Sequence, residues 1–154
     1  MAVVIILDIS ELDLTKMPGV AIEFPDPNNL INFNITITPS EGLYKNCTYT
    51  FSFNLPPNYP YDPPKVDCNT LIYHPNIDFN GAMCLNILDD WKPILNLEPV
   101  IFELMHLFIE PNPDDSLNTE AADLMINNKA EFESRVYTSL RGGTVAGRQF
   151  PKLL

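Results

Sequence analysis

The chain has 154 residues, of which 45% are hydrophobic and 19% are charged, and its formal net charge is −11 at pH 7. This length suits one domain with its own core, and the negative charge argues against nucleic-acid binding because few cations could neutralise phosphates. The sequence has no apolar run of the roughly 20 residues that a membrane helix needs, and no basic residue precedes the opening MAVVIIL as in a secretory signal.

The first half of the chain predicts one helix followed by short strands. The helix is expected over residues 3–14, and a possible first strand over 21–24. Residues 31–38 and 48–54 alternate apolar and polar side chains, which is typical of half-buried strands, and 65–68 predicts another strand. The positions expected to face inward are Ile31, Phe33, Ile35, Ile37, Tyr49, Phe51 and Phe53.

The second half predicts irregular structure and then helices. Residues 56–64 contain five prolines, which remove backbone donors and exclude regular structure. The next helix starts at Asn96, a good N-cap, and ends before Pro111. Two further helices are expected over 119–127 and 130–140.

This order of a helix, antiparallel strands and then helices indicates an α+β domain. We expect the domain to cover residues 1–143 and residues 144–154 to form a loose tail. The irregular region 56–95 separates the two halves, and a long connection in a small domain usually carries function.

The stretch YHPNIDFNGAMCLNIL, residues 73–88, holds one of two histidines and one of three cysteines. A zinc site is not expected, because Cys68, His74 and Cys84 lack the closely spaced ligand pairs of such sites. The odd, sparse set of cysteines also does not suggest a secreted disulfide framework. We therefore expect a protein of the cytosol, the nucleus or both.

A cysteine hydrolase would need an imidazole base and a group that orients it. His106 falls in the middle of a predicted helix, and Pro75 favours an extended His74, which suits a histidine that pins a loop through its ring nitrogens. The hydrolase interpretation is therefore poor, although the residues alone do not exclude it.

A third possibility is a thiol that exchanges acyl groups. A thioester is already activated, so Cys84 could accept and release an acyl group without a dedicated base. Such a site needs a donor for the oxyanion, for which Asn76 has the right chemistry, and a group that receives the attacking amine, which Asp115 could provide.

Several separated motifs carry a family resemblance. The run HPNI, then Gly81, then Cys84 followed by LNIL resembles the active-site signature of the ubiquitin-conjugating enzymes. YPYDPPKV resembles their Tyr-Pro-x-x-Pro-Pro loop, and Trp91, Pro93 and EPNPDDSLN fall where the family has counterparts. CLNIL, DWKP, EPNP and SLRGG are most similar to the branch that conjugates the Nedd/Rub modifier.

The resemblance covers most of the chain, roughly residues 8–143, and implies the conjugating-enzyme fold. That fold has a four-stranded antiparallel meander sheet, an N-terminal helix and C-terminal helices. Cys84 would carry the modifier as a thioester. Asn76 would stabilise the oxyanion or hold the active-site loop, and Asp115 would help to receive the incoming lysine.

The resemblance also implies supporting and partner-binding residues. The active-site loop would be supported by His74, Pro75 and Leu85, and the ligase-facing surface would include Tyr61, Lys92 and Pro93.

The implied reaction takes a Nedd/Rub-type modifier from its activating enzyme and passes it to a lysine of a target, a cullin, with a RING-type ligase. No cofactor is implied, because ATP is consumed by the separate activating enzyme, and the protein would act as a monomer. The alternatives are ubiquitin transfer, or a weakly active adaptor that binds a ligase or modifier.

The sequence departs from the family in ways that affect docking and positioning but remove no catalytic atom. No basic residue occurs before Lys16, and the N-terminal docking extension of the Nedd/Rub branch is expected to be absent. The segment before Trp91 is one residue shorter than usual and lacks an arginine. Ser116 replaces a usual proline, which should loosen the loop that carries Asp115.

Overall fold

The computed structural model describes residues 2–154, so Met1, the first residue of the predicted domain, lies outside the described residues. One antiparallel sheet has the order β1-β2-β3-β4, which confirms the predicted α+β class and meander. Its strands are β1 (Val20–Glu23), β2 (Asn32–Ile37), β3 (Tyr49–Asn54) and β4 (Lys65–Cys68).

The register between β2 and β3 places Phe33 opposite Phe53 and Ile35 opposite Phe51, and these side chains are buried. The prediction that Ile31 faces inward is wrong. The strand begins at Asn32, and the Ile31 side chain is 36% exposed.

The first helix is shorter than expected. It forms α1 (Ala2–Ser10), and a separate 3-10 turn, η1 (Leu14–Lys16), follows it. The Asp13 carboxylate accepts a hydrogen bond from the Thr15 amide, so a new N-cap interrupts the apolar pattern that suggested one helix.

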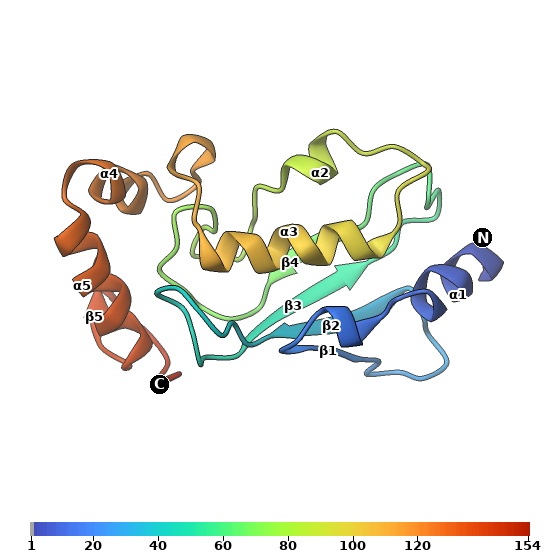
Figure 1. Cartoon of the computed structure of the whole chain (residues 1–154), viewed down its shortest axis with the longest axis horizontal. Helices are drawn as coiled ribbons and strands as arrows, with labels where there is room; N and C mark the ends of the chain where they lie inside the picture. The colour runs from blue at the N-terminus through green and yellow to red at the C-terminus, as the bar shows by residue number, and fades with distance from the viewer. Residues whose placement is uncertain (1) are drawn as a thin grey trace.

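The long helix α3 (Leu97–Ile109) crosses one face of the sheet (Figure 1). Its Asn96 N-cap accepts from the Glu98 amide, as predicted. The ring of Phe108 lies 4.6 Å from that of Tyr49 and 5.5 Å from that of Phe51. The sheet and α3 therefore share one aromatic core.

The helices α4 (Thr119–Asn127) and α5 (Lys129–Leu140) lie at the end of the molecule opposite α1 (Figure 1). The prediction of a loose tail is wrong, because β5 (Thr144–Val145) and β6 (Arg148–Gln149) form a hairpin. Its two turn residues both have positive φ, and the Phe150 side chain after it is 3% exposed.

The connection between β4 and α3 is irregular except for the short helix α2 (Asn86–Asp89), which the sequence did not predict. Gly81 has φ +92°, and a Cβ there would lie 2.2 Å from the Cys68 carbonyl oxygen, so glycine is required. The segment 56–64 contains no helix or strand, as predicted. None of the helices in the described part of the chain has the length and apolarity needed to cross a bilayer.

Candidate active site

His74 is fully buried, and its ring links the segment before Cys84 to α3. One ring nitrogen, Nε2, lies 2.9 Å from the Leu107 carbonyl oxygen on α3, and the other, Nδ1, accepts from the Asn76 amide at 3.0 Å. Burial lowers the pKa of the His74 ring to about 4, so the ring is neutral near pH 7. A neutral ring with its proton on Nε2 satisfies both contacts. The predicted ring hydrogen bonds are present, and both nitrogens are occupied, which argues against a general base.

The Asn76 side chain, 1% exposed, is directed at the loop that carries Asp115. Its amide nitrogen donates to the Asn112 carbonyl at 2.6 Å and to the Asp115 carbonyl at 3.0 Å. Its oxygen accepts from the Asn112 amide at 2.9 Å. Of the two predicted roles, this geometry supports holding the loop, because an oxyanion could gain the amide hydrogens only by displacing a carbonyl.

Pro75 holds the far side of the same loop. Its carbonyl oxygen accepts from the amides of Leu117 and Asn118, at 2.9 and 3.0 Å. The 3-10 turn η2 (Pro113–Asp115) lies between these anchors, with Asp115 exposed at its end. The predicted loosening by Ser116 is therefore opposed by hydrogen bonds on both sides of that residue.

Cys84 is half-buried, and its amide donates to the Asn76 carbonyl at 3.3 Å. Burial raises the pKa of the Cys84 thiol, and the carboxylates of Asp89 and Asp115 raise it further. The Asp115 carboxylate therefore acts electrostatically on the Cys84 thiol. A thiol with a raised pKa is unlike the thiolate of a cysteine hydrolase and suits exchange with an acyl group that is already activated.

Comparison with known proteins identifies the family. A family profile described as ubiquitin-conjugating enzyme matches residues 5–140. The chain belongs to the ubiquitin-conjugating enzyme family. The resemblance seen in the sequence is confirmed, and so is the assignment to a class of enzymes that form a thioester and transfer it.

Relatives of this conjugating enzyme support the likeness to the Nedd/Rub branch. The "NEDD8-conjugating enzyme Ubc12" of Dictyostelium discoideum is 58% identical over 96% of this chain, which spans 64% of that protein's length. The "Nedd8-conjugating enzyme UbcE2M" of Drosophila melanogaster is 49% identical over 93% of this chain and 78% of that one. The solved structure of Ubc12 from S. cerevisiae matches with a TM-score of 0.89 at 35% identity, covering 98% of this chain and 82% of that one. The predicted fold is therefore confirmed.

The predicted partner residues of this conjugating enzyme are exposed. Tyr61 is 76% exposed, and Lys92 and Pro93 also face solvent. Between them, the Trp91 ring nitrogen donates to the Pro60 carbonyl at 2.7 Å. Although the preceding segment is short, Trp91 therefore ties the proline-rich loop to the loop that carries Lys92 and Pro93.

Leu85, the residue after Cys84, is buried in the core at 2% exposure and is the N-cap residue of α2. Sequence reasoning missed the residue that holds this helix. The carboxylate of Glu103 on α3 accepts from the Asn86 amide at 3.0 Å and from the Ile87 amide at 3.1 Å. A glutamate on a helix surface carries no sequence signal for such a contact.

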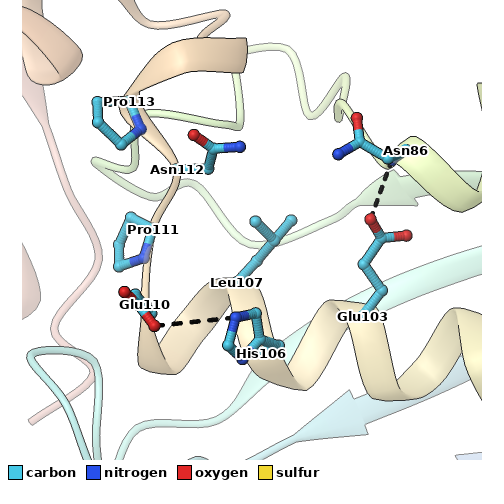
Figure 2. Close-up of a pocket in the computed structure, with 8 residues that line it drawn as sticks. All are labelled: Asn86, Glu103, His106, Leu107, Glu110, Pro111, Asn112 and Pro113. Carbon is cyan, nitrogen blue, oxygen red and sulfur yellow. Dashed lines mark hydrogen bonds and ion pairs between the residues drawn. The ribbon is translucent and has the colours of Figure 1, made fainter.

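A hollow of about 300 Å³ lies between α3 and the loop that precedes η2, and Glu103 and Asn86 line it. Figure 2 shows Glu103 extending from α3 toward Asn86, with the carboxylate of Glu110 just past the end of that helix. The residues that line the hollow are Asn86, Glu103, His106, Leu107, Glu110, Pro111, Asn112 and Pro113.

Cys47 and Cys68 are buried free thiols, and burial raises the pKa of Cys68 to about 11. These two cysteines are therefore poor nucleophiles beside Cys84. Among the described residues no three metal-ligating side chains gather as a cluster.

Proposed function

We propose that this enzyme conjugates NEDD8, carrying the modifier on Cys84. The observation that supports the chemistry best is the arrangement around Cys84, whose amide is bonded to Asn76 while the Asn76 side chain holds the loop of Asp115. The choice of modifier is supported by the relatives named as NEDD8-conjugating enzymes.

The first step of the proposed reaction is thioester exchange. The Cys84 sulfur attacks the carbonyl carbon of the thioester on the activating enzyme, whose own sulfur leaves and takes up a proton. The reaction exchanges one thioester for another, so it needs no strongly basic group at Cys84.

In the second step a lysine amine attacks the same carbon, the bond to the Cys84 sulfur breaks, and an isopeptide bond forms. The attacking amine must lose a proton, and the departing sulfur ends as a thiol. We assign to Asp115 the role of orienting the amine and favouring loss of its proton, and the support for this role is that its carboxylate is exposed and acts electrostatically on Cys84.

The proposed partners follow from this reaction. They are the modifier, its activating enzyme, a RING-type ligase and a cullin that supplies the lysine, with the conjugating enzyme acting as a monomer. Tyr61, Lys92 and Pro93 would form part of the ligase contact. Since Cys84 must stay reduced, we place the reaction in the cytosol or nucleus.

A charging assay tests the proposal. The protein is mixed with ATP and either NEDD8 or ubiquitin, each with its own activating enzyme, and a reductant-sensitive adduct is sought. We expect an adduct with NEDD8 that Cys84→Ala fails to form and that Cys47→Ala, a matched change at a buried thiol, retains. Charging with ubiquitin alone would overturn the choice of modifier, and charging with neither would overturn the transfer reaction and favour an adaptor.

A further inference from the structure

The short helix after the nucleophile depends on a residue from another element. The helix α2 has four residues and begins two positions after Cys84. Its N-cap residue, Leu85, supplies no side-chain acceptor, so the first amides of the helix lack a local partner. A helix this short is not stable by itself in water. Something outside it must hold these amides.

Glu103 is the group that does so. One oxygen of its carboxylate accepts from the Asn86 amide at 3.0 Å and the other from the Ile87 amide at 3.1 Å. Two hydrogen bonds to an ionised acceptor also fix the direction of the helix, because each oxygen takes one amide. Figure 2 shows the Glu103 side chain reaching from α3 to the backbone at Asn86.

The helix that carries Glu103 is packed into the core. Its neighbour Leu104 is completely buried, and Leu107, one turn on, is buried and gives its carbonyl to His74. The same helix therefore holds both sides of the nucleophile, through His74 and Asn76 before Cys84 and through Glu103 after it. The segment between Cys84 and Trp91 is also short and lacks the family's arginine, so Glu103 is its main polar tie to the core.

We infer that Glu103 is a positioning residue for Cys84, acting through its forked bond to the first amides of α2. This inference rests on the proposed transfer reaction. Without Glu103 the backbone at Asn86 is free to move, and a thioester on Cys84 samples orientations in which Asp115 and the lysine do not meet it. Since a misplacement of about 1 Å can cost about a hundredfold in rate, we expect Glu103→Ala to slow discharge to free lysine by about tenfold.

The matched control is Glu110→Gln. Glu110 lines the same hollow and is also a glutamate, but its carboxylate makes an ion pair at 3.9 Å with the exposed His106 and does not cap α2. Glu103→Gln is the graded variant, because its amide oxygen can accept one of the two backbone amides while its nitrogen cannot accept the other. The expected order of discharge rates is wild type and Glu110→Gln, then Glu103→Gln, then Glu103→Ala.

The experiment combines two measurements. Hydrogen exchange at the Asn86 and Ile87 amides, measured by NMR on the protein without a modifier on Cys84, reports the cap directly. Single-turnover discharge of the protein that carries the modifier on Cys84 reports positioning. We expect Glu103→Ala to speed exchange at both amides and to slow discharge, with little change in melting temperature.

Two results would overturn the inference. Faster amide exchange with unchanged discharge would make Glu103 a structural cap only, and equal slowing by Glu103→Ala and Glu110→Gln would point to the charge of the hollow. Failure of the wild-type protein to charge is a separate result that counts against the proposed function.

Discussion

Asp115 acts on the Cys84 thiol in one direction, and its proposed role in transfer acts in the opposite direction. Burial raises the pKa of the Cys84 thiol, and the Asp89 and Asp115 carboxylates add to that effect. Below the pKa of the thiol, removing either carboxylate increases the thiolate fraction. We therefore expect Asp115→Asn and Asp89→Asn each to speed alkylation of Cys84 by iodoacetamide about twofold or more at pH 7.5.

The proposed role of Asp115 in receiving the amine predicts the reverse for transfer. Asp115→Asn should slow discharge to lysine by at least about tenfold, whereas Asp89→Asn, the matched change, should leave discharge close to wild type. Alkylation rates and single-turnover discharge are measured on the same three proteins. Slowing by both variants would show a general effect of negative charge near Cys84 and no specific role of Asp115, and slowing by neither would remove Asp115 from the reaction.

At the scale of secondary-structure elements, the C-terminal hairpin supports the loop that leads to Cys84. The Phe150 ring, 3% exposed, meets the Phe79 ring edge-on at 6.0 Å, and the Arg148 guanidinium lies 4.5 Å from the centre of that same ring. Phe79 is in the turn that contains Gly81. The C-terminal segment therefore packs through Arg148 and Phe150 against the segment between Asn76 and Cys84.

Truncating the Phe150 side chain tests this support. We expect Phe150→Ala to lower the free energy of unfolding by about 3 kcal/mol, the usual cost of deleting a buried aromatic ring, as measured by urea denaturation. Leu154→Ala, which truncates a side chain that is 47% exposed, should cost less than about 1 kcal/mol. Equal small losses in both variants would mean that the hairpin contributes little to the fold.

The elements that the sequence predicted are those with strong local signals. The strand β4 and the helix α4 have the predicted bounds, and Asn118 caps α4 by accepting from the Ala121 amide. The hairpin at 144–149 was missed because its turn is Ala146-Gly147, which lacks the usual Asn-Gly or Asp-Gly signal. The helix α2 was missed because it is stabilised by Glu103 on another element and not by its own sequence.

The candidate site shows the same division. Cys84, His74 and Asn76 could be selected from the sequence because their residue types and spacing form a motif. Whether Asn76 faces an oxyanion or the Asp115 loop depends on side-chain direction, which only the fold determines. The contact of Glu103 with the backbone near Cys84 crosses 17 residues and involves atoms that every residue possesses, so no pattern could reveal it.

At the scale of the whole molecule, the active site is attached to the main core through a buried histidine. The His74 ring lies 4.9 Å from the ring of Tyr44, in the connection between β2 and β3, and 5.1 Å from the ring of Phe108 on α3. A charged ring in this position would have no compensating anion among its hydrogen-bond partners, which are a carbonyl and an amide. Protonating His74 must therefore weaken the fold as a whole.

The sign and size of this effect follow from linkage. Burial lowers the pKa of His74 to about 4 in the folded protein, and the unfolded value is about 6.5. Between these pH values the unfolded chain binds a proton at His74 that the folded chain does not. The contribution of the neutral ring to the free energy of unfolding is therefore complete above about pH 6.5 and falls as the pH drops toward 4. The expected contribution of His74 to the loss between pH 7.5 and pH 5 is about 2 kcal/mol.

Urea denaturation at both pH values measures this loss in wild type, His74→Asn and His106→Gln. His74→Asn is less stable at pH 7.5 but lacks the titrating ring, so its loss on acidification should be smaller than that of wild type by about 2 kcal/mol. His106→Gln removes the other histidine, which is exposed on α3, and should retain the wild-type loss. Equal losses in wild type and His74→Asn would show that carboxylates alone cause the acid sensitivity and that the buried ring accepts a proton without cost to the fold.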